Sequence, residues 1–195
     1  CSFTVTVLDA QAPVINCPSS VVLTPNTSGC LAIYNLTIPN ATDNCSGTLQ
    51  VSYSVLNPDN TMSAIYDETQ LEYEFGVGNS QVRWIFTDAS GNSSYCYQLV
   101  TVVNNATVSS EVLTDNQCNA NPGVGSVLLT ANQAGVITVN GVSQNVTAPL
   151  YQATFTGLGA GYFTATFTSN TTGCTAQTSF NISNQNSNLT AEQKT

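Results

Sequence analysis

The stretch QVRWIFTDASGNSSYCYQLVTV, residues 81–102, decides the fold. Apolar and polar side chains alternate on both sides of a short polar segment, which is the period of a β-strand with one buried face. The segment TDASGN between them has turn chemistry, because Asp88 can accept backbone N–H bonds and Gly91 supplies a positive φ. The stretch therefore predicts two strands joined by a tight connection.

Alternating runs of the same kind recur along the chain, rich in Val, Ile, Thr, Tyr and Phe and interrupted by Gly, Pro, Asn and Asp. Signals for helices are nearly missing. Many short strands with frequent turn residues are typical of a β-sandwich. The expected strands are residues 21–24, 31–37, 49–55, 70–75, 81–87, 95–103, 125–131, 135–139, 151–156, 161–169 and 176–182.

The 195 residues are enough for two domains of about 100 residues each. Residues 103–111 alternate polar and apolar side chains without turn residues, so we expect a short extended joint there. The predicted organisation is a first sandwich at residues 10–104, a second at 105–184, and a linker or disordered tail at 185–195.

The first nine residues nearly repeat a later segment. CSFTVTVLD at residues 1–9 corresponds to CYQLVTVVN at residues 96–104. We interpret the two segments as the same strand in successive copies of one unit, so that residues 1–9 are the last strand of a preceding repeat. Cys1 is then the counterpart of Cys96 and is expected to be unpaired.

The composition excludes several classes of partner. Only 7% of the residues are charged, the net charge is −9, and Arg83 and Lys194 are the only basic side chains. Nucleic acids and anionic membranes both require cations, so we expect binding to neither. No apolar run approaches the ~20 residues of a membrane span.

The cysteines indicate the compartment. The chain has no CxxC pair and no histidine, so the ligand spacing of a zinc site is missing. Isolated cysteines in a polar β-type sequence favour structural disulfides and an extracellular location, with free buried thiols as the alternative. Apart from Cys1, the candidates form an even set: Cys17, Cys30, Cys45, Cys96, Cys118 and Cys174.

The four cysteines of the first domain can pair in three ways. If the first strand starts where the second finishes, Cys17 lies close to Cys45, and Cys30 is left for Cys96. We favour this arrangement, with the other pairings open. In the second domain, Cys118 and Cys174 form the expected pair.

Two acidic segments are candidates for a cation site. TDASGN is first a turn, but Asp88, with Asp43 of ATDNC, could also bind calcium, which takes six to eight oxygens. Since only these two carboxylates can be named, we favour the turn and expect no cofactor. The second segment, YDETQLEYE at residues 66–74, is read as a solvated strand edge, with cation binding as the alternative.

The only tryptophan is expected in the core. Alternation places Val82, Trp84 and Phe86 on one face of their strand, and Arg83 on the other. A buried Trp84 is the default in a sandwich, and an exposed platform for sugars is the alternative. Arg83 would then face outward and could meet Glu72 or Glu74 across strands.

Motifs spread over the first domain resemble the hyalin-repeat (HYR) family. They are Phe75 with Gly78, TDASGN at residues 87–92, and Cys96 with Val100, preceded by APVINCP, SGC and PNATDNC at residues 12–18, 28–30 and 39–45. The resemblance covers roughly residues 10–104. It implies an extracellular module that is not a catalyst.

The second domain is similar to the SprB-type repeats of giant surface adhesins in gliding Bacteroidetes. The similarity rests on GVGSVLLT, FTGLGAGYFTATFTS and GCTAQTSFNIS, at residues 123–130, 155–169 and 173–183. Together the two resemblances imply an all-β chain of two tandem immunoglobulin- or fibronectin-like β-sandwiches stabilised by disulfides.

The function expected from the sequence is non-catalytic. There is no histidine for general base chemistry and no lysine outside the tail. We expect rigid spacer or adhesive modules of a large surface protein, with neighbouring repeats, surface polysaccharide or other cell-surface proteins as partners. A carbohydrate- or ligand-binding module is the alternative.

Overall fold

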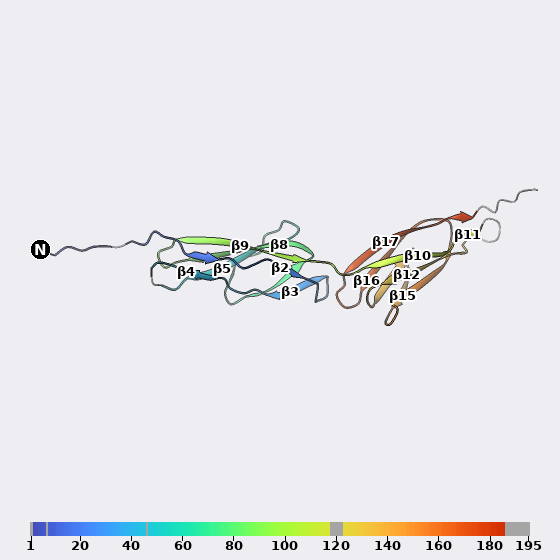
Figure 1. Cartoon of the computed structure of the whole chain (residues 1–195), viewed down its shortest axis with the longest axis horizontal. Coiled ribbons are helices and arrows are strands. Elements are labelled where there is room, and N and C mark those ends of the chain that lie inside the picture. The colour runs from blue at the N-terminus through green and yellow to red at the C-terminus, as the bar shows by residue number, and fades with distance from the viewer. Residues whose placement is uncertain (1, 7, 46, 118–122, 186–195) are drawn as a thin grey trace, which may run out of the picture. The chain divides into compact units, whose positions relative to one another are not determined.

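The computed structural model describes residues 2–6, 8–45, 47–117 and 123–185 (Figure 1). The chain divides into two compact units, Cys1–Asn104 and Asn105–Thr195. In the described ranges every regular element is a β-strand, so the predicted all-β class is confirmed. None of these ranges contains a helix with the length and hydrophobicity that a membrane span requires. Cys1, Cys118 and most of the predicted tail lie outside the described residues.

The first unit is a sandwich built around a five-stranded sheet with the order β2-β9-β8-β5-β6. β3 pairs with β7 and β1 pairs with β4 in two further small sheets. The strands are β1 Val14–Asn16, β2 Val21–Leu23, β3 Leu31–Asn35, β4 Asn40–Thr42, β5 Gln50–Leu56, β6 Tyr66–Asp67, β7 Glu72–Gly76, β8 Gly78–Thr87 and β9 Ser93–Val102.

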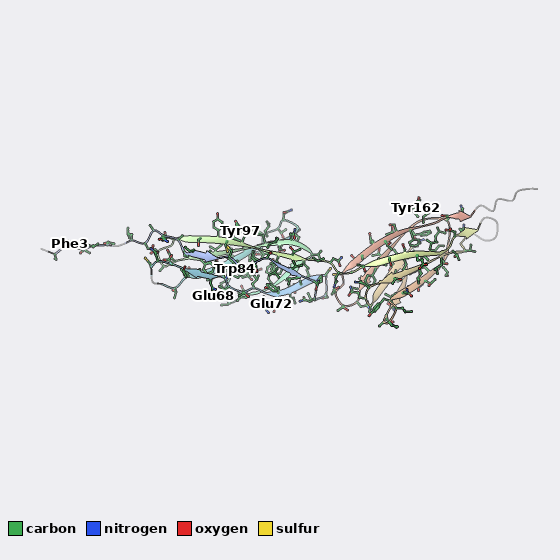
Figure 2. The ribbon with its side chains drawn as sticks, in the orientation of Figure 1. Phe3, Glu68, Glu72, Trp84, Tyr97 and Tyr162 are labelled. Atoms are coloured by element: carbon green, nitrogen blue, oxygen red, sulfur yellow. The ribbon has the colours of Figure 1, made fainter. Side chains whose placement is uncertain are left out.

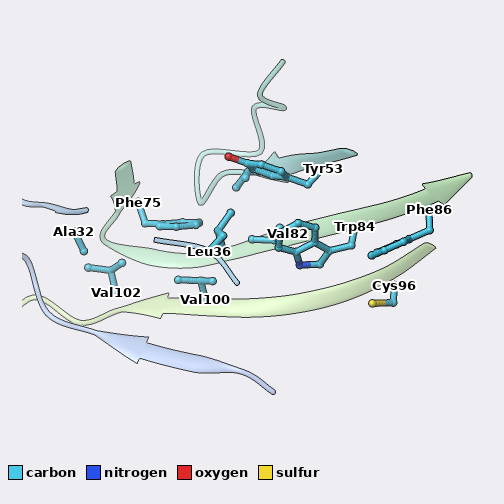
Figure 3. Close-up of a cluster of buried hydrophobic side chains, with 11 residues drawn as sticks. Ala32, Leu36, Tyr53, Phe75, Val82, Trp84, Phe86, Cys96, Val100 and Val102 are labelled. Atoms are coloured by element: carbon cyan, nitrogen blue, oxygen red, sulfur yellow. The ribbon is translucent and has the colours of Figure 1, made fainter. Parts of the chain in front are cut away.

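The core of the first unit lies between the large sheet and the smaller sheets (Figure 3). Ala32 of β3, the nearby Leu36 and Phe75 of β7 pack in one cluster with the inward side chains of β8 and β9. Trp84 is fully buried there, as the alternation along β8 predicts. Burial of these apolar side chains is the main stabilising contribution to such a fold.

The second unit has a three-stranded sheet with the order β10-β12-β15 and a four-stranded sheet with the order β14-β13-β16-β17. A short parallel pair, β11 with β18, adds a third sheet. The strands are β10 Val108–Thr114, β11 Asn116–Gln117, β12 Gly125–Ala131, β13 Gly135–Val139, β14 Val142–Val146, β15 Gln152–Leu158, β16 Gly161–Ser169, β17 Thr175–Ile182 and β18 Asn184–Gln185.

Buried side chains come from both larger sheets of the second unit. Val127 and Leu129 of β12 and Ile137 and Phe167 of the other sheet are each fully buried. Each sheet thus contributes one apolar face, which is the arrangement of an immunoglobulin-like sandwich.

Two sequence-based expectations differ from the structure. The extended joint expected at residues 103–111 is shorter, because β10 begins at Val108 and pairs with β12 along its length. Residues 2–6, 8 and 9, expected to form a strand, belong to none, and Phe3 is 88% exposed. A strand needs a neighbour for its backbone groups, and no described strand pairs with this segment.

Candidate functional site

The TDASGN segment forms the tight connection between β8 and β9. Asp88 Oδ1 accepts hydrogen bonds from the backbone N–H groups of Ser90 and Asn92, each at 2.8 Å. Asn92 Nδ2 donates to Asp88 Oδ2 at 2.8 Å, and Gly91 has a φ of 89°. The hydrogen bonds, with that from Asn92 first, lower the pKa of the Asp88 carboxyl, because they favour its charged form.

A cluster of acidic groups lies beside this turn. One side-chain ligand atom each from Asp9, Asp43 and Cys45 lies within 4.8 Å of the others. Asp88 joins them in lining a small cavity of about 50 Å³. We call these four residues the acidic cluster. The Asn92 amide also donates to the backbone carbonyl of Asp9 at 3.2 Å, so the segment before β1 is fastened to the turn.

The acidic cluster has a free acceptor. Asp43 Oδ1 accepts from the Cys45 N–H at 3.0 Å, whereas Asp43 Oδ2 is buried without a hydrogen-bond partner. The nearby acids raise the pKa of the Cys45 thiol, first through a side-chain hydrogen bond to Asp9 and then through burial and the charges of Asp9, Asp43 and Asp88. Cys45 is therefore held as a neutral thiol at neutral pH.

The sequence predicted two members of the acidic cluster and missed two. Asp43 and Asp88 do meet at one end of the unit, as the calcium alternative requires. Asp9 was assigned to a preceding repeat, and Cys45 was considered only as half of a disulfide. The oxygens suit a hard cation, but both oxygens of Asp88 are engaged by the turn, and a thiol is a poor calcium ligand. The donor set therefore does not complete a calcium site by itself.

The acidic segment at residues 66–74 stays at the surface. Glu68, Glu72 and Glu74 are exposed, and Asp67 accepts a bond from the Thr69 N–H at 2.9 Å within its own turn. In Figure 2, Glu68 and Glu72 lie on the opposite side of the unit from Tyr97. No cluster of potential metal ligands includes these acids in the part of the chain that the structure describes.

The predicted pairing of Arg83 with Glu72 or Glu74 is wrong. β8 lies between β5 and β9, and β7 belongs to another sheet, so Arg83 faces Ser54 and Tyr97 across its strands. Its guanidinium carbon instead lies 4.6 Å from the centre of the Tyr95 ring, a cation–π contact.

The aromatic side chains divide between core and surface. Trp84 is 0% exposed, and its Nε1–H donates to Gln98 Oε1 at 3.4 Å, so an exposed Trp84 platform is excluded. Tyr95 and Tyr97, on the outer face of β9, are 58% and 48% exposed, with ring centres 5.7 Å apart. Surface aromatics are therefore present, but they come from β9.

The cysteines do not pair as expected from the sequence. Cys30 and Cys174 are each disulfide-bonded, whereas Cys17, Cys45 and Cys96 are thiols. The favoured Cys17–Cys45 and Cys30–Cys96 pairs are therefore not the ones that this structure has. The reason is topological: Cys17 lies where the chain leaves β1 for β2, which pairs with β9, whereas Cys45 lies in the acidic cluster.

Comparison with known families confirms the resemblance of the first unit. Residues 8–102 match the HYR domain family. The comparison with curated proteins found no significant match. HYR and immunoglobulin-like modules are typically extracellular, as expected from the sequence, and are typically non-catalytic.

Solved structures of similar fold share little sequence with the chain. The four N-terminal Ig domains of Dscam1 isoform 9.44 match with 10% identity and a TM-score of 0.36, over 91% of this chain and 47% of that one. Protocadherin Gamma B7 cadherin domains 1–4 match with 12% identity and a TM-score of 0.34, over 88% and 49%.

SGBP-B of the Bacteroides ovatus mixed-linkage glucan utilization locus, solved in complex with a mixed-linkage heptasaccharide, matches with 12% identity and a TM-score of 0.33, over 91% of this chain and 48% of that one. The chain thus spans about half the length of these structures. Residues 8–102 are similar to the HYR domain family, and a second β-sandwich follows them in the chain.

Proposed function

We propose that the chain supplies two non-catalytic modules of a large extracellular protein, serving as rigid spacer or adhesive elements of an adhesin or filament. One observation carries the proposal: three aspartates of the first unit are engaged by their own turns. Asp59, Asp67 and Asp88 each accept the backbone N–H two residues further on, at 2.8–3.0 Å. These three carboxylates, a residue type that enzymes use as acid or base catalysts, stabilise turns in this unit.

The surface of the first unit offers little for catalysis. An open depression of about 470 Å³ lies over β5, lined by Thr48, Ser52, Asp67, Glu68 and Thr87 among others. Its carboxylates, Asp67 and Glu68, are exposed, and Asp67 is engaged by the Thr69 N–H and hydroxyl within its own turn. The chain contains no histidine. The residues present support a structural function for this surface.

The length of the central strands supports a mechanical function. β8 and β9 pair in register over ten residues, from Gly78 opposite Val102 to Thr87 opposite Ser93. A hydrogen-bonded ladder of that length, packed on a buried aromatic core, resists local opening because the bonds break only together with the core. Cys30 and Cys174 are disulfide-bonded, which adds covalent reinforcement.

The finer part of the proposal rests on the sequence of the second unit alone, which lies outside the residues that match the HYR domain family. We propose, from the resemblance of its motifs to SprB-type repeats, a filament of the kind used in surface adhesion and gliding motility. Neighbouring repeats of the same protein are then the immediate partners, and surface polysaccharide or other cell-surface proteins are the distant ones.

Limited proteolysis of the oxidised full chain tests the spacer proposal. Trypsin is unsuitable, since Arg83 and Lys194 are the only basic residues. We expect a protease of broad apolar specificity to leave residues 14–102 and 125–182 intact, because paired strands run through both ranges. Rapid cleavage within β8 or β9, or saturable turnover of any substrate in an activity screen, would overturn the proposal.

A carbohydrate-binding function is the second candidate, favoured by one observation. The depression of about 200 Å³ on the outer face of β8 and β9 is lined by Arg83, Gln81, Tyr97, Met62 and Leu56. The Nε of Arg83 is buried without a hydrogen-bond partner. An exposed aromatic ring beside polar donors is the combination that stacks on and hydrogen-bonds a sugar.

Titration of the full chain against a glycan panel separates the two candidates. Binding by this surface predicts saturable affinity that is lost in Tyr97→Ala and kept in Tyr162→Ala, since Tyr162 is exposed on the second unit. No saturable binding, or equal loss in both variants, would leave the spacer function alone.

A further inference from the structure

The chain between β1 and β2 runs alongside β9 in a constant register. β2 pairs with β9 in parallel, with Val21 opposite Val100 and Leu23 opposite Val102. Upstream of β2, Gln98 Nε2 donates to the carbonyl of Ser19 at 3.1 Å. Residues 19 and 98 are 79 positions apart, as are 21 and 100, so the same offset holds before the strand begins.

That offset places one cysteine beside another. Two residues before Ser19 is Cys17, and two residues before Gln98 is Cys96. Parallel neighbours in a sheet lie about 4.7–4.9 Å apart, and disulfides join Cα atoms about 4.4–6.8 Å apart. The side chains do approach each other, because the Cys17 thiol is hydrogen-bonded to that of Cys96. After burial, this bond is the second cause that raises the pKa of Cys96, to about 12.

We propose that Cys17 and Cys96 are a disulfide site, and that their bond fastens the crossing between the two sheets to β9. β1 pairs with β4 in one sheet, and β2 pairs with β9 in another, so residues 17–20 cross from sheet to sheet. Each of these two strands is only three residues long. Few backbone hydrogen bonds therefore hold residues 17–20 against the sheet. A disulfide at Cys17 would keep this segment attached to β9 even when those hydrogen bonds open.

The chemistry requires an oxidised dithiol carrier. Cys17 is exposed, so its thiolate attacks one sulfur of the carrier disulfide and forms a mixed disulfide, releasing one carrier thiolate. The thiolate of the buried Cys96 then attacks the Cys17 sulfur and releases the second carrier thiolate. The two protons lost by the cysteines are taken up by the carrier, which leaves as a dithiol. Two electrons pass from the protein to the carrier.

The same geometry leaves Cys45 out of the pair. Cys45 is exposed in the acidic cluster, where neighbouring carboxylates disfavour its thiolate. Cys96, in contrast, lies directly opposite the buried Trp84 in the register of β8 and β9. The proposed bond is therefore packed against the aromatic core, whereas Cys45 is not.

Peptide mapping of the oxidised full chain tests the pairing. The chain is alkylated without reductant in denaturant, digested and analysed by mass spectrometry. Besides the cross-linked peptides of Cys30 and Cys174, we expect a species that joins the peptides of Cys17 and Cys96, and alkylated Cys45. Alkylated Cys17 and Cys96, or a cross-link of either to Cys30 or Cys45, would overturn the proposal.

Two variants keep the test independent of folding. Cys17→Ser changes an exposed residue, so the fold should persist, and Cys96 should then react with alkylating agent only after unfolding. Reductant should lower the melting temperature of the first unit in the wild type more than in Cys17→Ser. Cys45→Ser is the matched control and should behave as the wild type; equal shifts in wild type and Cys17→Ser would contradict the pairing.

Discussion

At the scale of single residues, the first unit uses the same hydrogen-bonded aspartate turn three times. Asp59, Asp67 and Asp88 each cap a turn by accepting a backbone N–H. In each case a hydrogen bond from a nearby side chain, followed by those from the backbone, lowers the pKa of the carboxyl. A carboxylate that hydrogen-bonds to the backbone of its own turn stays near solvent, so it loses little hydration energy. The bond holds the turn in the conformation that follows the strand. The acidic side chains therefore stabilise the connections between strands.

Asp88 should make the first unit sensitive to acid. Its pKa in the folded state lies below the ordinary value of 3.8, so its contribution is complete above that value and is lost as the pH falls through the folded pKa. We expect Asp88→Asn to be less stable than wild type at pH 7, with the difference vanishing toward pH 2. Urea unfolding across this pH range measures it.

Glu72→Gln is the control for this prediction, since it removes an exposed strand carboxylate instead. A difference between Asp88→Asn and wild type that stays constant from neutral to acidic pH would show that the charge of Asp88 is not what the turn uses.

Substitution of Trp84 tests how much the aromatic core contributes to the stability of the first unit. Trp84 is fully buried against Tyr53, with ring centres 5.2 Å apart. Truncating a buried tryptophan to alanine costs about 3–5 kcal/mol, so Trp84→Ala should lower the unfolding free energy of the first unit by that amount. Chemical denaturation followed by circular dichroism measures the loss, and Tyr97→Ala, on the outer face, should cost much less.

At the scale of elements, the hairpin β8–β9 was predictable and the strand crossing was not. Alternation around TDASGN identifies both strands and the turn, because all the information is local. The crossing at residues 17–20 depends on parallel pairing with a strand 79 residues away. Nothing in the sequence near Cys17 indicates that partner, so the favoured cysteine pairs were wrong.

Seven strands were not predicted, and β10 and β14 show why. β10, with the sequence VSSEVLT, has the composition of an extended linker and becomes a strand through its pairing with β12. β14, with the sequence VSQNV, is polar because it lies at the edge of its sheet. Edge strands carry weak patterns, since only part of one face is buried. The acidic cluster was half predicted, because Asp9 enters it from outside the first strand.

Gly135 tests the packing of β13 on β16. A Cβ atom built there would collide with the Thr168 carbonyl and the Phe167 ring, so only glycine permits the approach. We expect Gly135→Ala to destabilise the second unit by about 1–3 kcal/mol through overpacking, as measured by thermal unfolding. Gly159→Ala, where a Cβ meets nothing within 4 Å, should be neutral, and equal effects would contradict the packing.

At the scale of the whole molecule, three features suit the proposed spacer function. The net charge is −9 with two basic residues, three aspartates are engaged by their own turns, and Cys30 and Cys174 are disulfide-bonded. Such a molecule is kept soluble by amide and hydroxyl groups and is held apart from anionic surfaces by its charge.

A structural ion is not required in this account. Since the turn engages both oxygens of Asp88, we expect the melting temperature to be unchanged when a chelator replaces added calcium. A calcium-dependent rise that disappears in Asp43→Asn would instead show that the acidic cluster holds a cation.

Differential scanning calorimetry of the oxidised full chain, with and without reductant, tests the central claim of covalently braced, inert sandwiches most directly. Disulfides that close loops of about 15–100 residues contribute about 3–4.7 kcal/mol. Each kcal/mol shifts the melting temperature of a domain of about 100 residues by roughly 4–8 °C. We therefore predict that reduction lowers the unfolding temperature by at least about 10 °C. An unfolding temperature that reductant leaves unchanged would contradict the claim.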